Sequence, residues 1–492
     1  MDKNNVRLSN LLDDKEFLAQ DEKNDFMLSP VPLDKRRPTL SQIWVWVGFG
    51  YVVTGLFVGG VLAGHGDMPG LTPSETILAI ILGMGSLFLI TSFLGIVAQR
   101  IGLNLSLLSR YTYGAKGMIL PMLAMALMTL GWFSNITGMV GDIWGQFLGN
   151  SSGITIIDPS KFGYNIPPIT LEAFLATVVW GLVFTYTAAK GITSIEKVAT
   201  YVGWIILIIA LSMGYVMIKQ AGGMDSFMNI ANQREGLSLG SGVTVLVGSW
   251  IAGAVMGVDL FRFNKNLLAV WLGSAACFLI TNPILNIVGY ISTVSYGNYN
   301  FVAWMIVQSM LLAILGVFTW TVSLWTTNQS ELYCNSLYLG PIFDSLGMKD
   351  INRSRIAFVI GTFGTIIAAL GVYQMFFANF ISILGAVGPP ICAPILADYF
   401  IVYRNDKTKY DKRTLYNQPE YRWAGIVSFV VGGILGYLFE YYIKLPGDFP
   451  SGLAALIIAF IVYVAIYKLV PDYEEDKKLI EKLQSQKASQ AN

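Results

Sequence analysis

Residues 323–328 read Ser-Leu-Trp-Thr-Thr-Asn, and this stretch places three hydroxyls and one amide inside an otherwise apolar segment. On a helix, Ser323, Thr326 and Thr327 share one face because they fall at positions i, i+3 and i+4. Neutral oxygen ligands suit a small hard monovalent cation, and the adjacent Asn328 can donate and accept hydrogen bonds toward a polar planar solute. The alternative is that these hydroxyls only bond back to carbonyls of their own helix, as is common in membrane spans.

The composition is that of a polytopic membrane protein. Of 492 residues, 54% are hydrophobic and 13% are charged, which is more apolar surface than a soluble chain of this length can bury. The formal net charge of +1 argues against a nucleic-acid partner.

The sequence offers no set of residues suited to enzyme chemistry. Cys277, Cys334 and Cys392 lie in apolar runs without metal-ligand spacing, and His65 is the single histidine. The sequence also has no Gly-rich phosphate loop and no nucleophile elbow. We therefore expect a protein that is not an enzyme and that needs no cofactor beyond a coupling ion.

The hydropathy pattern predicts an all-α protein with twelve transmembrane helices. A further stretch, 300–310, is amphipathic and too short to span, which favours an interfacial helix. The twelve apolar segments lie near 41–64, 76–98, 118–147, 168–189, 197–219, 239–262, 268–292, 312–338, 355–373, 376–402, 422–443 and 450–470.

The distribution of basic residues predicts the orientation. All but four of the 32 Lys and Arg fall in the terminal segments and in the loops after even-numbered spans. The exceptions are Lys161, Lys219, Arg234 and Lys444. Because positive loops stay inside, both termini are expected in the cytoplasm, with the chain in the cell membrane. Residues 1–40 read as a mostly disordered cytoplasmic tail, and 471–492 as a second tail.

Interruptions mark three spans. The first carries five glycines between Gly48 and Gly60, and the sixth carries four between Gly242 and Gly257. They are five spans apart, where an inverted repeat of five plus five spans would place two broken helices, although glycine also serves close helix packing. Pro389 and Pro390 predict a bend in the tenth span.

Three tryptophans lie at the centres of spans, which is unusual because tryptophan favours the membrane interfaces. Trp132, Trp250 and Trp325 fall near the midpoints of the third, sixth and eighth segments. Two facing indoles would stack a flat heteroaromatic ring. Polar residues at similar depth, namely Thr129, Ser249 and Asn328, favour a ligand slot over simple core packing.

Several short motifs, in order and at family spacing, resemble the nucleobase–cation symporters, and specifically their cytosine and purine permease branch. The resemblance covers residues 30 to 470. Its motifs are Thr-Ser-Phe-Leu-Gly at 91–95, Gly-Trp-Phe at 131–133, Val-Gly-Ser-Trp at 247–250, 259–263, 325–328 with Leu332 and Tyr333, Pro389-Pro390 and Ala-Asp-Tyr at 397–399.

The resemblance implies a LeuT-type fold in which residues 41–219 and 220–402 form the two inverted repeats and 403–470 adds two helices. It implies that Trp132 and Trp250 clasp a nucleobase, that Asn328 bonds its edge and that Ser249 lies on the substrate side. It also implies a Na⁺ site made of Ser323, Thr326 and Thr327 with the backbone carbonyls of Gly48 and Val52.

The sequence departs from bacterial cytosine permeases at several of these positions. Thr129 replaces a glutamine that reads the base, Ser323 replaces an asparagine and Ala252 replaces a serine. Trp250 is the aromatic of the hydantoin-transporting branch, where cytosine permeases have phenylalanine. The choice among cytosine, a purine and another flat heterocycle therefore stays open.

The function expected from the sequence is import of a nucleobase or related heterocycle with Na⁺ by alternating access. The alternatives are proton coupling in the same fold and a non-nucleobase substrate such as a hydantoin. Glu331, one turn from Thr327, is expected to be solvated or paired with a basic loop residue, or else to carry the proton. Asp259 and Arg262 are expected to pair at the inner gate. A single polar cluster at one depth does not suit a channel.

Overall fold

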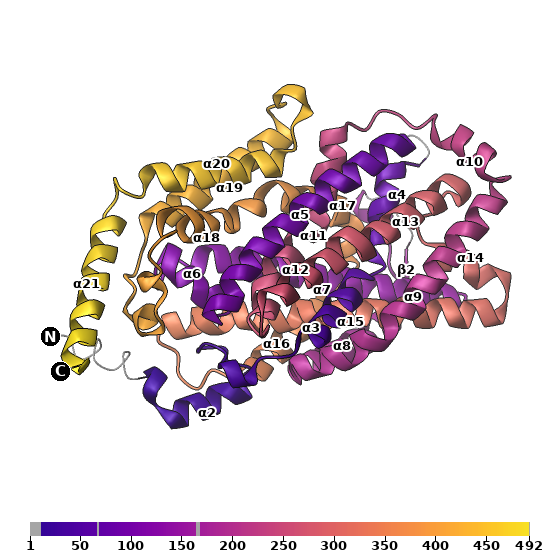
Figure 1. Ribbon diagram of the computed structural model, residues 1–492. Helices are drawn as coiled ribbons and strands as arrows, with labels where there is room; N and C mark the ends of the chain where they lie inside the picture. The colour runs from indigo at the N-terminus through magenta and orange to yellow at the C-terminus, as the bar shows by residue number, and fades with distance from the viewer. Residues whose placement is uncertain (1–10, 66–67, 164–167, 492) are drawn as a thin grey trace.

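The computed structural model describes residues 11–65, 68–163 and 168–491. It is mostly helical, as predicted, with a two-stranded sheet, and α2 and α21 lie at one end of the molecule and α10 and α14 at the other (Figure 1). The elements are α2 (Lys15–Lys23), α3 (Thr39–Gly50), α4 (Thr54–Ala63), α5 (Pro73–Ile101), α6 (Leu105–Tyr113), α7 (Ile119–Phe147), β1 (Thr155–Ile157), β2 (Ile169–Thr170), α8 (Leu171–Ala189), α9 (Ile192–Gln220), α10 (Met224–Ala231), α11 (Leu239–Phe261), α12 (Leu267–Ala275), α13 (Asn282–Tyr296), α14 (Phe301–Gln308), α15 (Met310–Ser345), α16 (Arg353–Ala369), α17 (Val372–Val387), α18 (Ala393–Ala397), α19 (Trp423–Tyr441), α20 (Ser451–Ile466) and α21 (Asp472–Ala491).

Each of the twelve predicted apolar segments coincides with helical structure. In the described part of the chain, eight helices are long and apolar enough to cross a membrane, or up to ten if each of two bent pairs is one span. The remaining two segments fall on the shorter helices α16 and α20. The protein therefore has the character of an integral membrane protein, and the count of twelve crossings stays a prediction. The stretch 300–310 contains the short helix α14, as expected.

The first span is broken, as its glycines predict. Helices α3 and α4 meet at 46°, and residues 51–53 between them are not α-helical. Close packing fixes α4 beside α13, because a Cβ on Gly59 would come 1.9 Å from the Asn286 carbonyl oxygen. Only glycine fits there without moving the backbone.

The expected break in the sixth span is wrong, because α11 runs without interruption from Leu239 to Phe261. In its most apolar stretch, 94% of the residues are buried, so α11 lies at the centre of the bundle. Its glycines serve packing instead. A Cβ on Gly248 would come 2.3 Å from the Ile381 carbonyl oxygen of α17, so this glycine lets two backbones touch.

The tenth span is interrupted where the prolines predict it. Helix α17 ends at Val387, the prolines form a 3₁₀ turn, and α18 follows at Ala393. A π-helical turn, Ala276–Thr281, lies between α12 and α13 and is a feature that the hydropathy pattern does not predict. Pro283 in the first turn of α13 lacks the N–H that a regular helix needs at that position, which favours such a wide turn.

The N-terminal segment is folded from Leu11 onward, where the sequence predicted a mostly disordered tail; residues 1–10 of that prediction lie outside the described residues. Met27 is fully buried, and Arg262 donates hydrogen bonds to the carbonyl oxygens of Asp25 and Phe26 at 2.7 and 2.6 Å. The apolar run 26–28 supplies the anchor, although it is short within a highly charged stretch.

These contacts also correct the pair expected between Asp259 and Arg262. The guanidinium of Arg262 serves the N-terminal segment and meets Asp259 through its backbone carbonyl, at 3.1 Å. The Asp259 carboxylate accepts a hydrogen bond from the Leu105 amide at the start of α6, at 2.9 Å. Both charges are structural, but they hold different parts of the chain.

A buried charge network ties α21 to the transmembrane body. The Lys409 ammonium lies 2.9 Å from the carboxylate of Asp398 and 3.0 Å from that of Asp476, and all three side chains are fully buried. Arg422 also pairs with Asp476. Burial alone would raise the pKa of Asp476, but the charges of Lys409 and Arg422 hold it below its usual range. The start of the predicted tail 471–492 is therefore part of the fold.

Candidate functional site

Helix α15 meets the broken first span at Ser323. The Ser323 hydroxyl donates to the Tyr51 carbonyl oxygen at 3.0 Å and accepts from the Val53 amide at 3.1 Å. These two backbone groups lie on either side of Val52 and have lost the helical partners that an unbroken span would supply. One side chain therefore closes the hydrogen bonding of the break.

The hydroxyls on this face of α15 differ in their hydrogen bonding. Thr326 bonds back to the Ser323 carbonyl at 2.8 Å, as the structural alternative anticipates. Thr327, in contrast, is buried, and its hydroxyl oxygen has no hydrogen-bond partner among the described residues. A buried hydroxyl without a partner is costly in a membrane protein. The alternative of simple back-bonding thus accounts for Thr326 but not for Ser323 or Thr327.

The two predicted backbone ligands lie at the same break. Gly48 is in the last turn of α3, and Val52 is in the unwound residues. The Val52 carbonyl accepts from the Gly55 amide at 3.1 Å, which leaves a second lone pair on that oxygen. The chemistry of this donor set, neutral hydroxyl and carbonyl oxygens with one hydroxyl lacking a partner, fits a small cation such as Na⁺.

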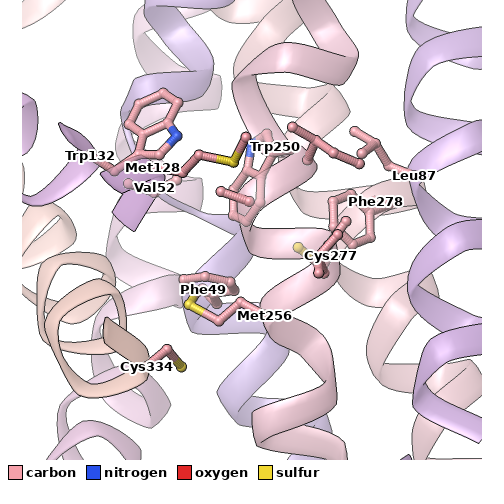
Figure 2. Close-up of a cluster of buried hydrophobic side chains, with 14 of the residues drawn as sticks. Phe49, Val52, Leu87, Met128, Trp132, Trp250, Met256, Cys277, Phe278 and Cys334 are labelled. Carbon is pink, nitrogen blue, oxygen red and sulfur yellow. The ribbon is translucent and has the colours of Figure 1, made fainter. Parts of the chain in front are cut away.

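The predicted indoles lie in one buried cluster a short way from the break (Figure 2). Trp132 and Trp250 are each 4% exposed and sit at the middles of α7 and α11. Trp250 makes edge-on contacts with Phe49 and Phe278, with ring centroids 5.0 and 5.5 Å apart. Trp132 makes a similar contact with Phe380 at 5.7 Å. Perpendicular contacts with neighbouring phenylalanines therefore fix both indoles in the cluster.

Met128 belongs to this cluster and was not predicted. Figure 2 shows its side chain extending from the Trp132 side toward Trp250. Its position four residues before Trp132 on α7 could have drawn attention to it, because such residues share a helix face. An unbranched thioether fills irregular gaps and changes rotamer readily, so it suits a wall that must adapt to a ring.

Asn328 points at α7 and keeps one free acceptor. Its amide nitrogen donates to the Thr137 hydroxyl at 2.8 Å, while its carbonyl oxygen is buried without a partner in the described chain. Ser249, just before Trp250, is buried, and its hydroxyl bonds back to the Leu246 carbonyl at 2.7 Å. Of the polar residues predicted to bind the substrate, Asn328 therefore retains the clearest unmet hydrogen-bonding capacity.

Thr129 is engaged between two helices. Its hydroxyl donates to carbonyls of α7 and accepts from the Asn335 amide of α15 at 2.9 Å. The pairs Thr129–Asn335 and Thr137–Asn328 thus join α7 and α15 at two levels, about two turns apart. Sequence reasoning did not identify Asn335, although it lies seven residues, or two turns, after Asn328.

Two asparagines of α13 reach the break from the other side. Asn282, which follows the π-helical turn, donates to the Gly50 carbonyl at 3.5 Å, and Asn286 donates to the Asn282 side chain at 3.2 Å. The side-chain oxygen of Asn286, Oδ1, is buried without a hydrogen-bond partner in the described chain. Single π-helical turns are frequent at functional sites, and Pro283 is the local residue that favours this one.

Glu331 is buried and has no ion pair within the described residues, which corrects the expectation of an exposed or loop-paired carboxyl. It is 4% exposed, and its Oε2 has no hydrogen-bond partner in the described chain. Its neighbour Gln329 is also buried, with both amide atoms unpartnered in the same part of the chain. The eighth span continues well below this depth, to Ser345, so Glu331 does not reach the helix end.

Trp325 lies on the opposite side of α15 from the site. Its indole N–H donates to the Thr187 hydroxyl of α8 at 3.0 Å, and its ring lies against Trp180 and Phe184. Of the three midplane indoles, two therefore share the buried cluster and the third faces α8.

Comparison with known proteins identifies the family of this chain. A family model described as permease for cytosine/purines, uracil, thiamine, allantoin matches residues 30–456. This chain belongs to that family. The resemblance read from its motifs is confirmed, and the permease is a membrane transporter rather than an enzyme.

Characterised relatives of this permease are distant but nearly full length. The cytosine permease of Escherichia coli (strain K12) is 26% identical over 433 residues, which is 88% of this chain and 92% of the relative. The hydantoin permease of Microbacterium maritypicum is 22% identical, with 80% of each chain covered. The allantoin permease of Bacillus subtilis (strain 168) is 21% identical, with 90% and 93% covered.

Solved structures share the fold of this permease. Mhp1, a nucleobase-cation-symport-1 family transporter in a closed conformation with bromovinylhydantoin bound, matches with a TM-score of 0.71 at 19% identity, over 92% of this chain and 98% of that chain. A Na⁺-coupled sialic acid symporter matches with a TM-score of 0.62 at 12% identity, over 94% and 95%. These likenesses support a LeuT-type transporter fold; the division into five plus five plus two spans stays a prediction.

Proposed function

We propose that this permease imports a nucleobase or related flat heterocycle together with Na⁺ by alternating access. The observation that carries the proposal is the meeting of α15 with the broken first span, where Ser323 closes the break and Thr327 leaves a buried hydroxyl without a described partner. Broken helices at mid-membrane supply the backbone ligands of ions in secondary transporters.

The substrate is proposed to bind between Trp132 and Trp250. Each indole is buried and meets a phenylalanine ring at a steep angle, and stacking of the substrate on the indole faces is part of the proposal. The free carbonyl oxygen of Asn328 would accept a hydrogen bond from the edge of the heterocycle. Ser249 and Thr129 are proposed to line the slot beside the two indoles, and Met128 would move aside as the ring enters.

Na⁺ is proposed to bind the hydroxyls of Ser323, Thr326 and Thr327 and the carbonyls of Gly48 and Val52. The Ser323 hydroxyl bonds the Tyr51 carbonyl and the Val53 amide at the break. A bound ion would be coordinated by the oxygen atoms that the break leaves without helical partners. Ion binding would then set the angle between α3 and α4, and Phe49 in α3 contacts Trp250. This contact supplies a physical link through which Na⁺ and substrate would raise each other's affinity.

Two alternative functions, proton coupling and transport of a hydantoin-like substrate, each depend on a specific residue. Proton coupling would use Glu331, a buried carboxyl whose Oε2 lacks a partner in the described chain. A hydantoin-like substrate is favoured by Trp250, the residue shared with the hydantoin-transporting branch. Both alternatives keep the same fold and the same slot.

The substrate class is tested by thermal-shift measurements on the purified permease. A ligand that binds the native state raises the melting temperature, and a saturation of 100-fold over Kd stabilises by about 2.7 kcal/mol. We expect a shift with cytosine, a purine or a hydantoin, and a larger shift when NaCl replaces choline chloride. Shifts that are equal in both salts would remove Na⁺ from the proposal while leaving the substrate assignment intact.

A further inference from the structure

Helices α7, α8 and α15 enclose an apolar groove on the side of α15 away from the transport site. Its cavity is about 440 Å³, within the range of small-molecule sites. The indoles of Trp144, Trp180 and Trp325 line this groove. Ile314 and Val322 of α15 also belong to its lining. We infer that this groove is a binding site for one acyl chain of a membrane phospholipid.

The groove presents no polar atom to an occupant. The Trp144 indole N–H donates to the Thr321 hydroxyl at 2.9 Å, and Thr321 donates in turn to the Val317 carbonyl at 2.7 Å. The Trp325 indole N–H donates to Thr187 at 3.0 Å. With these groups satisfied inside the protein, only ring faces and alkyl side chains line the recess, which selects a hydrocarbon over a polar ligand.

The length and position of the groove match one leaflet. From Ile314 to Trp325, the axis of α15 rises by about 16 Å, close to half of a hydrocarbon core of about 30 Å. All three enclosing helices are candidate membrane spans, and the lining residues Ile314 and Phe318 are more than half exposed, so the groove opens to lipid. The leaflet is the one farther from the chain ends, because α14 lies at the opposite end of the molecule from α2 and α21 (Figure 1).

A second, smaller recess continues the groove toward the α14–α15 corner. It shares Phe147 with the groove and holds about 160 Å³. Gln308 and Ser309, both exposed, lie at this end and offer the polar surface that a lipid ester region needs. Volumes of about 440 and 160 Å³ suit a single alkyl chain rather than the helix face of a second protein copy.

Occupancy of this groove would bear on transport because its floor is the transport helix. Trp325 lies within the stretch 323–328, and Thr321 is two residues before Ser323. An acyl chain packed against the three indoles, which contact one another at 5.8 and 6.2 Å between ring centroids, would hold this half of α15 against α7 and α8 while the broken first span moves on the other side.

The test uses full-length permease in detergent micelles and a phosphatidylcholine whose palmitoyl chain carries a diazirine. With an equimolar amount of probe, photolabelling is expected to map to peptides containing 314–325 and to be displaced by unlabelled phosphatidylcholine. Val322→Phe, which fills the groove, should reduce this labelling several-fold. Val430→Phe, which adds the same volume to the lipid-facing surface of α19, should leave it unchanged.

The wild-type measurement alone can refute the inference. Labelling that spreads over exposed positions such as those of α19, and that unlabelled lipid does not displace, would mean bulk lipid contact only. Undiminished labelling of 314–325 in a folded Val322→Phe protein would also place the chain outside the groove.

Discussion

The Ser323 hydroxyl of α15 accepts a hydrogen bond from the Val53 amide at 3.1 Å, so a helix distant in the sequence completes the backbone of the broken first span. The same hydroxyl donates to the Tyr51 carbonyl at 3.0 Å. A buried backbone group without a partner costs about 1–3 kcal/mol. The geometry of the break therefore depends on one side chain that also belongs to the proposed ion site.

Ser323→Ala is expected to lower stability by about 1–3 kcal/mol, because it leaves the Val53 amide and the Tyr51 carbonyl unpaired. The same change should weaken the effect of Na⁺ on substrate affinity. Ser330→Ala is the matched control, since Ser330 is buried on the same helix and only bonds back to Thr326. Melting curves with and without Na⁺ check both parts; equal behaviour of the two variants would contradict the role of Ser323.

Trp132→Ala and Trp250→Ala should each weaken substrate binding by about one to two decades, because stacking on an aromatic ring contributes roughly 1–3 kcal/mol per base. Equilibrium binding of radiolabelled substrate measures this loss. Trp423→Ala serves as the control, because this indole is half exposed on α19. Unchanged affinity in a folded Trp132→Ala protein would remove that indole from the slot.

Thr129→Gln should shift preference toward cytosine, because it introduces the amide that the family resemblance implies for recognition of the base. Thr129→Val is the control: it removes the hydroxyl that accepts from Asn335 without adding an amide. Competition by cytosine and by bicyclic purines gives the ranking in each protein. If the ranking moves in neither variant, Thr129 acts only as a contact between α7 and α15.

Asp476→Ala should destabilise the protein by about 3–5 kcal/mol, because it leaves Lys409 and Arg422 buried with too little negative charge. Glu481→Ala changes the charge by the same amount at an exposed position of α21 and should have little effect. Thermal unfolding in detergent compares the two. Similar melting temperatures would mean that α21 does not hold the transmembrane body.

Much of the architecture was predictable because hydropathy and helix breakers act locally. The apolar segments and the breaks near Gly50 and at Pro389 follow from properties of a few adjacent residues. The continuity of α11 was not predictable in this way. A glycine that breaks a helix and one that admits a neighbouring backbone, as Gly248 does, look the same in a sequence.

Only the part of the site that depends on local sequence features was predicted. The central positions of Trp132 and Trp250 could be read from segment midpoints, but Asn282 and Asn335 take part through contacts between distant helices. The anchoring of residues 26–28 depends on Arg262, more than two hundred residues away. No local sequence pattern shows which residues of distant segments contact each other, because these contacts depend on the direction of the side chains in the folded chain.

Uptake into proteoliposomes tests the central claim, Na⁺-coupled transport through the site at the break, most directly. Radiolabelled substrate identified by thermal shift is supplied outside, with either an inward Na⁺ gradient at equal pH or a pH gradient without Na⁺. We expect accumulation driven by the Na⁺ gradient alone, and its loss in Thr327→Ala with residual Na⁺-independent binding. Accumulation driven only by the pH gradient, and abolished by Glu331→Gln, would contradict the sodium account and move coupling one turn along α15.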